Sequence, residues 1–377
     1  MSTSSTAPTT EGSGHGTTSG HGRGQSAKRP AMSESVVRNL GLVGVMAILV
    51  IIGVWTAGDR FLSGNNLLII LELGAIIAVV SVGMTFVITG GGIDLSVGAI
   101  VALASVWATT AATQYYADQY GFMVMVLCAL IVGTVVGAVN GFLIAYGRIV
   151  PFIMTLAMLA SARGLAEQIS QNRSQLVTND AFLDVFRTRI LGLPVNIVIM
   201  AVVAIAGWVL LNRTTFGRRT LAVGGNAEAA RLAGIDVRRH TMLLYTLLGF
   251  CCGIAAIMLT ARTTTGTSTH GSLYELDAIA AVVIGGTLLS GGRGTILGTL
   301  LGVLIFTTVT NIFTLNFLPT ATQDVAKGAI IVVAVLLQGR LAGGGLLPPW
   351  LRRPGSPGKL PAQTGAALDP DKPKPGA

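Results

Sequence analysis

Asp94 and Ser96 are the residues whose types and positions could most directly do chemistry. They follow three glycines in the segment Thr89–Ser96 (TGGGIDLS), where one apolar run stops and the next begins. An ionisable side chain at a helix break inside a membrane bundle predicts a point on the path of a polar solute. The alternative is that Asp94 or Ser96 only caps the second helix at a membrane surface.

Other polar side chains also lie inside apolar runs, where burial in lipid would be costly, so we expect them to face the interior of a bundle. Asp324 and Lys327 are spaced i, i+3, which predicts a structural ion pair. Arg163 and Glu167 at i, i+4 predict another. We assign six residues to a translocation pathway: Asp94, Ser96, Asn140, Thr155, Asn311 and Gln323.

Residues 213–240 form a polar segment, rich in arginine, between two apolar runs. Within it, Asn226 predicts a helix N-cap, Ala227–Leu232 a short helix, and Gly234 its end. Such a capped helix fits a groove in a soluble partner, whereas the alternative is a solvated loop whose arginines only set topology. A partner contact would use Gly225, Asn226, Glu228, Ala229, Ala230, Arg231, Gly234 and Ile235.

The residues predict no enzyme. With four histidines and few acids, no catalytic triad, metal cluster or pair of catalytic carboxylates can be assembled, so we assign no catalytic residue, no metal and no cofactor. Glu275 and Asp277 are expected in a first helical turn, at the positive end of the helix dipole. Leu289–Arg293 (LSGGR) is similar to the signature loop of ABC ATPases, but the chain contains no G-x-x-x-x-G-K-[ST] phosphate loop.

The elements that must position these residues are membrane-spanning helices. Of the 377 residues, 51% are hydrophobic, 11% are charged and 49 are glycine, which excludes a soluble enzyme, a disordered chain and a disulfide scaffold. Ten apolar runs each approach the ~20 residues that a helix needs to cross a bilayer. The fold class is therefore an all-α polytopic membrane protein of about ten spans: 40–57, 66–88, 95–113, 122–146, 151–169, 194–212, 241–261, 273–289, 295–314 and 320–338.

Three regions follow from the composition. Residues 1–38 and 339–377 are low in hydrophobic residues and predict disordered tails, while 39–338 forms the transmembrane domain. The net charge of +9 comes from basic residues in polar segments between spans, which sets topology and does not indicate nucleic-acid binding. Basic residues in the short loops divide eight to five, which places both termini and the 213–240 segment in the cytoplasm.

Taken together, several motifs resemble one family, the membrane permease subunits of bacterial ABC importers for ribose, xylose and related monosaccharides. The resemblance runs in order through residues 40–338. Its motifs are TGGGIDLSVG at 89–98, PFIMTL at 151–156 with RGL at 163–165, FGR at 216–218, GGNAEAARLAGI at 224–235, YELDAIAAVVIGGT at 274–287, and Gln323 with Lys327-Gly328.

This resemblance implies the ABC importer permease architecture in a bacterial cytoplasmic (inner) membrane. It implies three protein partners: ABC ATPase subunits, an extracellular solute-binding protein and a second permease copy in a homodimer. It also implies that 224–236 is the coupling helix that docks on the ATPase. Alternatives stay open: a permease for branched-chain amino acids, nucleosides or another small polar solute, or an ion-coupled secondary transporter, which would need paired acidic ion sites and usually an internal repeat.

Overall fold

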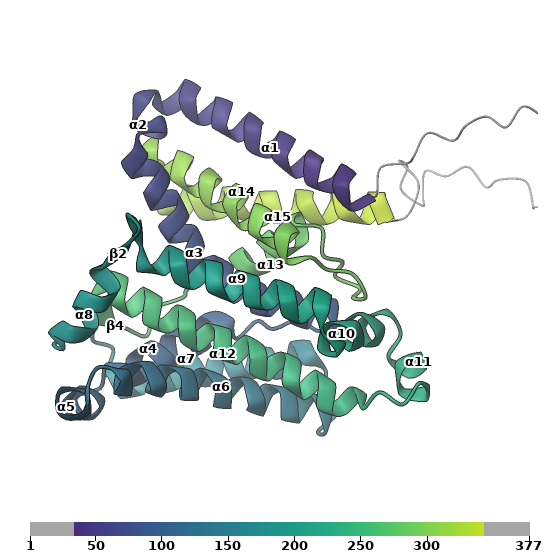
Figure 1. Cartoon of the computed structure of the whole chain (residues 1–377), viewed down its shortest axis with the longest axis horizontal. Helices are drawn as coiled ribbons and strands as arrows, with labels where there is room; N and C mark the ends of the chain where they lie inside the picture. Colours follow the sequence, from purple (N-terminus) through teal and green to yellow (C-terminus); the bar gives the residue numbers. More distant parts are fainter. Residues whose placement is uncertain (1–33, 343–377) are drawn as a thin grey trace, which may run out of the picture.

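The computed structural model describes residues 34–342, and they fold into a bundle of helices with two very short strand pairs (Figure 1). Strand β1 pairs antiparallel with β4, and β2 with β3. The helices are α1 (Glu34–Ala57), α2 (Asp59–Leu62), α3 (Gly64–Thr89), α4 (Val97–Ala108), α5 (Ala111–Tyr120), α6 (Met123–Ala145), α7 (Pro151–Ser170), α8 (Asp180–Arg187), α9 (Val195–Arg213), α10 (Thr215–Gly225), α11 (Ala227–Leu232), α12 (Val237–Thr263), α13 (Tyr274–Ile284), α14 (Ile296–Leu315) and α15 (Thr320–Ala342). The strands are β1 (Gln175–Leu176), β2 (Arg189–Ile190), β3 (Leu193–Pro194) and β4 (Thr265–Gly266).

Helices α3 and α12 form the centre of the bundle, and each is largely buried. Helix α12 packs on α3, α4 and α6, while α14 packs on α1, α3 and α13. The approach of α6 to α12 is close because glycines face one another there: a methyl group on Gly133 or Gly137 would strike the backbone of Gly249. Small residues of this kind let helices pack closely in lipid, where the hydrophobic effect gives no attraction between helices.

Six helices in the described residues are long and apolar enough to cross a membrane: α1, α3, α6, α9, α12 and α14. A seventh span results if α4 and α5, which are bent by 60° at their junction, are counted as one. The expected all-α polytopic fold is thus confirmed. Helices also occupy the remaining predicted runs, but α13 has 11 residues, so a count of ten spans stays a prediction.

Two predicted spans have different boundaries in the structure. The run 95–113 is broken after Ala108, where the Thr110 side chain accepts a hydrogen bond from Thr113 N and starts α5 in a new direction. The run 273–289 ends as a helix at Ile284, because Gly286 takes a left-handed backbone conformation (φ 86°). In both runs, the mean hydropathy of the whole run does not reveal the individual residues that end the helix.

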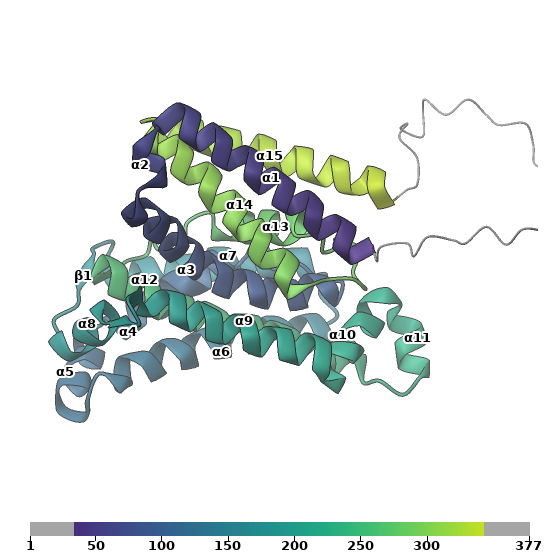
Figure 2. The ribbon, with the colours of Figure 1, turned by 45° about the horizontal axis from the view of Figure 1, so that its top comes forward.

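The bundle has two distinct ends. Helices α10 and α11 lie at one end, together with the beginning of α1 and the end of α15, whereas α5, α8 and the strands lie at the opposite end (Figures 1 and 2). We refer to these as the α11 end and the strand end.

Helices extend past the predicted limits of the transmembrane domain at both ends. Helix α1 begins at Glu34, inside the tail predicted for 1–38, and α15 continues to Ala342, inside the tail predicted for 339–377. The predictions for residues 1–33 and 343–377 fall outside the described residues.

Candidate functional site

Asp94 lies fully buried in the break between α3 and α4. Its Oδ1 accepts hydrogen bonds from the Ser96 backbone N–H (2.8 Å) and from the Ser96 hydroxyl (2.6 Å). Asn140 on α6 donates from Nδ2 to Ser96 Oγ (2.9 Å) and, more weakly, to Asp94 Oδ2 (3.4 Å). Three of the six predicted pathway residues therefore meet, and we call them the Asp94–Ser96–Asn140 cluster.

Helix α12 supports this break from another side. The Tyr245 hydroxyl donates a hydrogen bond to Ile93 O (3.2 Å), so the loop that carries Asp94 is tied to both α6 and α12. Asn140 Oδ1 is buried and has no hydrogen-bond partner. A buried acceptor without a donor, beside a carboxylate, is suited to the hydroxyl groups of a polar solute.

The capping alternative predicted for this break is only partly seen. Ser96 occupies the N-cap position of α4, but its side chain makes no capping bond to that helix. The Asp94 carboxylate instead binds the Ser96 N–H, which satisfies one free donor at the start of α4. Because the remaining contacts of Asp94 run to the Ser96 hydroxyl and to α6, the carboxylate does more than end a helix.

The other three predicted pathway residues have different hydrogen-bond partners, and no hydrogen bond within residues 34–342 joins them to the cluster. Thr155 is buried on α7 and donates its hydroxyl to Pro151 O (3.0 Å) in its own helix. Gln323 donates to Leu318 O (2.9 Å) and closes the turn that leads into α15. Asn311 on α14 is paired with Asn66 on α3.

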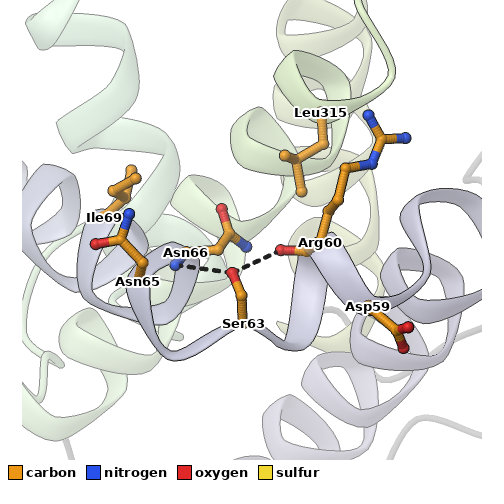
Figure 3. Close-up of a pocket in the computed structure, with 7 residues that line it drawn as sticks. All are labelled: Asp59, Arg60, Ser63, Asn65, Asn66, Ile69 and Leu315. Carbon is orange, nitrogen blue, oxygen red and sulfur yellow. Dashed lines mark hydrogen bonds between the residues drawn. The ribbon is translucent and has the colours of Figure 1, made fainter.

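The pair of Asn66 and Asn311 is reciprocal, since each amide donates to the other's oxygen (3.1 and 2.8 Å). Asn66 also lines a cavity of about 510 Å³ at the corner between α2 and α3, with Ser63 holding the Asn66 N–H and the Arg60 carbonyl (Figure 3). The sequence analysis missed Asn66, because it stands at the edge of an apolar run and gives no signal of a partner 245 residues away.

The predicted coupling segment forms the expected short helix, α11, at the α11 end. Asn226 is its N-cap and accepts a hydrogen bond from Ala229 N (2.9 Å), and Gly234 ends it with φ 84°. Gly224 and Gly225 form the last residues of α10, a further helix that the sequence analysis did not identify. The segment thus contains two helices joined at Asn226.

Glu228 and Arg231 pair on the exposed face of α11, as their spacing predicts. Arg231 donates to both carboxylate oxygens of Glu228, at 3.1 and 2.5 Å. The side-chain hydrogen bond from Arg231 holds the pKa of the Glu228 carboxyl below its usual range, so this surface carries both charges at neutral pH. Ala230 faces the opposite way and is buried.

Arg163 links α7 to the loop between β4 and α13 at the strand end. Its guanidinium donates to the carbonyls of Ser268 and His270. Glu167 also interacts with it electrostatically, as its spacing predicts, although Glu275 does so more strongly. His270 is buried between the hydroxyls of Ser105 (3.1 Å) and Thr263 (3.2 Å). Burial, reinforced by Arg163, lowers the pKa of the His270 imidazole to about 4.

Lys327 makes the predicted contact with Asp324, at 3.7 Å, and a second contact with Asp277 on α13, at 4.0 Å. Its ammonium group also lies over the Phe306 ring, 5.9 Å from the centroid. This cluster therefore ties α15 to the short helix α13, with Asp277 in the first turn of α13 as predicted.

Comparison with known proteins identifies the architecture. The family model described as branched-chain amino acid transport system / permease component matches residues 66–335. The chain belongs to this permease family. The permease is 41% identical over 311 residues to the ribose import permease protein RbsC of Bacillus subtilis (strain 168), with 81% of this chain and 94% of that relative covered. No solved structure matches it.

Two further relatives of the permease are named for ribose and for allose. It is 39% identical to the ribose import permease protein RbsC of Escherichia coli (strain K12), over 78% of this chain and 92% of the relative. It is 34% identical to the D-allose transport system permease protein AlsC of the same strain, over 79% of this chain and 90% of the relative. These relatives are permease subunits and not enzymes, as the sequence analysis expects of this chain.

Proposed function

We propose that this chain is the transmembrane permease subunit of an ABC importer that takes up a monosaccharide such as ribose, while a separate chain hydrolyses ATP. The observation that carries the proposal is the 41% identity to a ribose import permease over 94% of that relative. The Asp94–Ser96–Asn140 cluster is consistent with it, because a carboxylate and an unpaired amide oxygen can accept hydrogen bonds from sugar hydroxyls.

The proposed orientation places the α11 end in the cytoplasm. Eight arginines of the short loops lie at that end and five at the strand end, and cytoplasmic loops carry the excess of basic residues. Those at the α11 end are Arg148, Arg213, Arg218, Arg219, Arg231, Arg238, Arg239 and Arg293, and those at the strand end are Arg60, Arg173, Arg187, Arg189 and Arg262. Because α1 begins and α15 ends at the α11 end, both termini then face the cytoplasm, at an inner bacterial membrane.

Each protein partner has a proposed place in this arrangement. An ABC ATPase docks on α11, with Glu228 and Arg231 at the contact and Asn226 and Gly234 limiting the helix. An extracellular solute-binding protein meets the strand end. A second copy of the permease completes a homodimer, and polar residues of the predicted pathway, Thr155, Asn311 and Gln323 among them, face the passage in other states of the transport cycle.

A second candidate solute has its own support. The description of the matching family model names branched-chain amino acids, whereas the relatives above are named for ribose and allose. The sugar is favoured because the relatives named for ribose and allose are covered over 90% or more of their lengths.

Uptake in bacterial cells that lack a ribose permease tests the proposal. The chain is expressed with its own ATPase and binding protein, and accumulation of radiolabelled ribose is measured with unlabelled xylose, allose or leucine as competitors. We expect ribose uptake that disappears when the ATPase is omitted. Uptake of radiolabelled leucine but not of ribose in the same cells would favour the amino acid, and uptake that persists without the ATPase but stops with an ionophore would favour ion coupling.

A further inference from the structure

Three glycine-rich segments from distant parts of the chain, two turns and one helix end, meet at the α11 end. The first follows Thr89 at the end of α3, the second is the end of α10 at Gly224 and Gly225, and the third is the loop between α13 and α14 around Gly291 and Gly292. The Gly292 N–H donates a hydrogen bond to Thr89 O at 2.8 Å. We call this meeting point the glycine joint.

The three segments of the glycine joint touch through their backbones. A methyl group on Gly224 would overlap the Thr89 carbonyl oxygen and lie 2.6 Å from Gly292 N. A methyl group on Gly291 would lie 2.7 Å from Gly224 O and 3.0 Å from Gly91 Cα. No side chain separates the three segments, so any displacement of one must move the others or break the contact.

The joint lies between the proposed ATPase contact on α11 and the Asp94–Ser96–Asn140 cluster. Gly224 is two residues before Asn226, the N-cap of the coupling helix α11. Thr89 is five residues before Asp94, along a loop that the Tyr245 hydroxyl binds at Ile93. The path from the ATPase-binding surface to the buried carboxylate therefore consists of one backbone contact and a few residues of chain on either side.

Space for movement lies next to the joint. A cavity of about 270 Å³ borders the backbone of Gly91 and Gly92 and is also lined by Val223, Ala227 and Tyr245. The first turn of the joint and Ala227, the first residue of α11, thus border the same hollow.

Close glycine contacts also occur between α6 and α12, where they serve packing alone, because both sides belong to continuous helices. The glycine joint differs in that all its members lie in turns or at helix ends, and Gly291 and Gly292 adopt left-handed conformations (φ 83° and 75°). Turns and element ends are where the hinges of conformational changes are found.

From these observations we infer that the glycine joint is the link through which movement of α11 repositions the Asp94–Ser96–Asn140 cluster, with Gly224 as its positioning residue. The inference rests on the proposed function, since it takes α11 as the ATPase contact. It adds the residues that connect this contact to the pathway, and it makes coupling depend on a side chain being absent at position 224.

The test is the ratio of sugar transported to ATP hydrolysed. The permease is reconstituted in liposomes with its ATPase and binding protein, and ribose uptake and ATP hydrolysis are measured together. In Gly224→Ala we expect assembly and basal ATP hydrolysis to persist while uptake per ATP falls about tenfold or more, because overfilling a rigid contact acts on the coupling between the two sites. Gly164→Ala, where an added methyl meets no atom within 4 Å, is the control and should keep the wild-type ratio.

A second variant keeps the test decisive if Gly224→Ala does not assemble. In Gly292→Ala the added methyl meets Gly225 Cα at 2.9 Å and also strains the left-handed backbone at this position, and the ratio should fall clearly below that of the control. A wild-type ratio in any assembled joint variant overturns the inference, as does equal loss of uptake and hydrolysis. If wild-type protein shows no ribose uptake coupled to ATP, the proposed function itself fails, which is a different outcome.

Discussion

At the scale of single residues, Asp94 is held so that its charge and its structural contacts can be separated. Oδ1 takes both hydrogen bonds from Ser96, whereas Oδ2 faces only the Asn140 amide at 3.4 Å. An asparagine can keep the Oδ1 contacts. The contact that it gives up is the weak one, in which Asn140 donates to Oδ2.

We therefore predict that Asp94→Asn folds normally but transports poorly. The loss of the charge should lower uptake about tenfold or more, since intramembrane ionisable residues mark solute paths. Radiolabelled sugar uptake, normalised to the amount of permease in the membrane, measures this. Asp324→Asn, on a partly exposed carboxylate, is the matched control. Normal uptake in Asp94→Asn would leave the carboxylate with a purely structural role.

His270 makes the stability of the strand end sensitive to acid. Its pKa is lowered to about 4 by burial and by Arg163, whereas in the unfolded chain it is near the usual 6.5. The unfolded state thus binds more protons between these values, so stability falls as the pH drops below about 6.5, by about 2 kcal/mol at pH 5.

The variant His270→Gln should remove this contribution while keeping a side chain that can bond to Ser105 and Thr263. Thermal unfolding in detergent, followed by circular dichroism at pH 7 and pH 5, measures the midpoint of each protein. We expect the drop in midpoint on acidification to be smaller in His270→Gln than in wild type. An equal drop in both proteins would assign the acid sensitivity to other groups.

At the scale of elements, α11 is a helix of six residues whose existence depends on its caps. The Ala230 N–H donates to Asn226 O at 2.9 Å, and proline at this position would remove that bond. The local cost is about 3 kcal/mol, more than so short a helix can bear. The long spans, which are stabilised by packing, would be unaffected.

Ala230→Pro is therefore expected to reach the membrane in normal amount while losing both sugar uptake and co-purification of the ATPase. Immunoblotting of membranes and affinity purification of the complex test the two parts separately. Glu228→Lys, which reverses one surface charge beside Arg231, should show the same losses in milder form. Full uptake in Ala230→Pro would mean that α11 does not couple the two chains.

The cluster around Lys327 makes α13 dependent on α15. Replacing Lys327 by methionine would leave Asp277, whose side chain is 10% exposed, without its cation, at a cost of about 1–3 kcal/mol. We predict a lower unfolding midpoint for Lys327→Met and recovery of most of the loss in Lys327→Met/Asp277→Asn. Thermal denaturation of both proteins provides the measurement. If the second substitution lowers the midpoint further, the contact is not what Lys327 contributes.

Elements whose signals are local were predictable, and contacts between distant segments were not. The length of apolar runs predicted α1, α3, α6, α9, α12 and α14, and the cap residues Asn226 and Gly234 predicted α11. The bend after α4 was missed, because averaging hydropathy over a span hides two threonines. The pairing of Asn66 with Asn311 and the meeting of Gly224 with Thr89 depend on chain topology, which one sequence does not encode in its spacing.

At the scale of the whole molecule, the two ends of the bundle allow a direct test of orientation. Leu232, the last residue of α11, is 79% exposed, and Leu191, at the tip of the β2–β3 hairpin, is 98% exposed. In a variant without native cysteines, Leu191→Cys in intact cells should react with a membrane-impermeant maleimide. Leu232→Cys should react only after the membrane is opened. Reaction of Leu232→Cys from outside would reverse the proposed topology.

The glycine joint also bears on how such a protein can evolve. Most harmful core substitutions can be relieved by trimming the side chain that the new group strikes, but at position 224 the new methyl strikes the Thr89 carbonyl, which every residue type at position 89 would carry. A second mutation among these neighbours therefore cannot relieve the overlap. A screen for suppressors of Gly224→Ala should return reversion to glycine far more often than changes at positions 89 or 292.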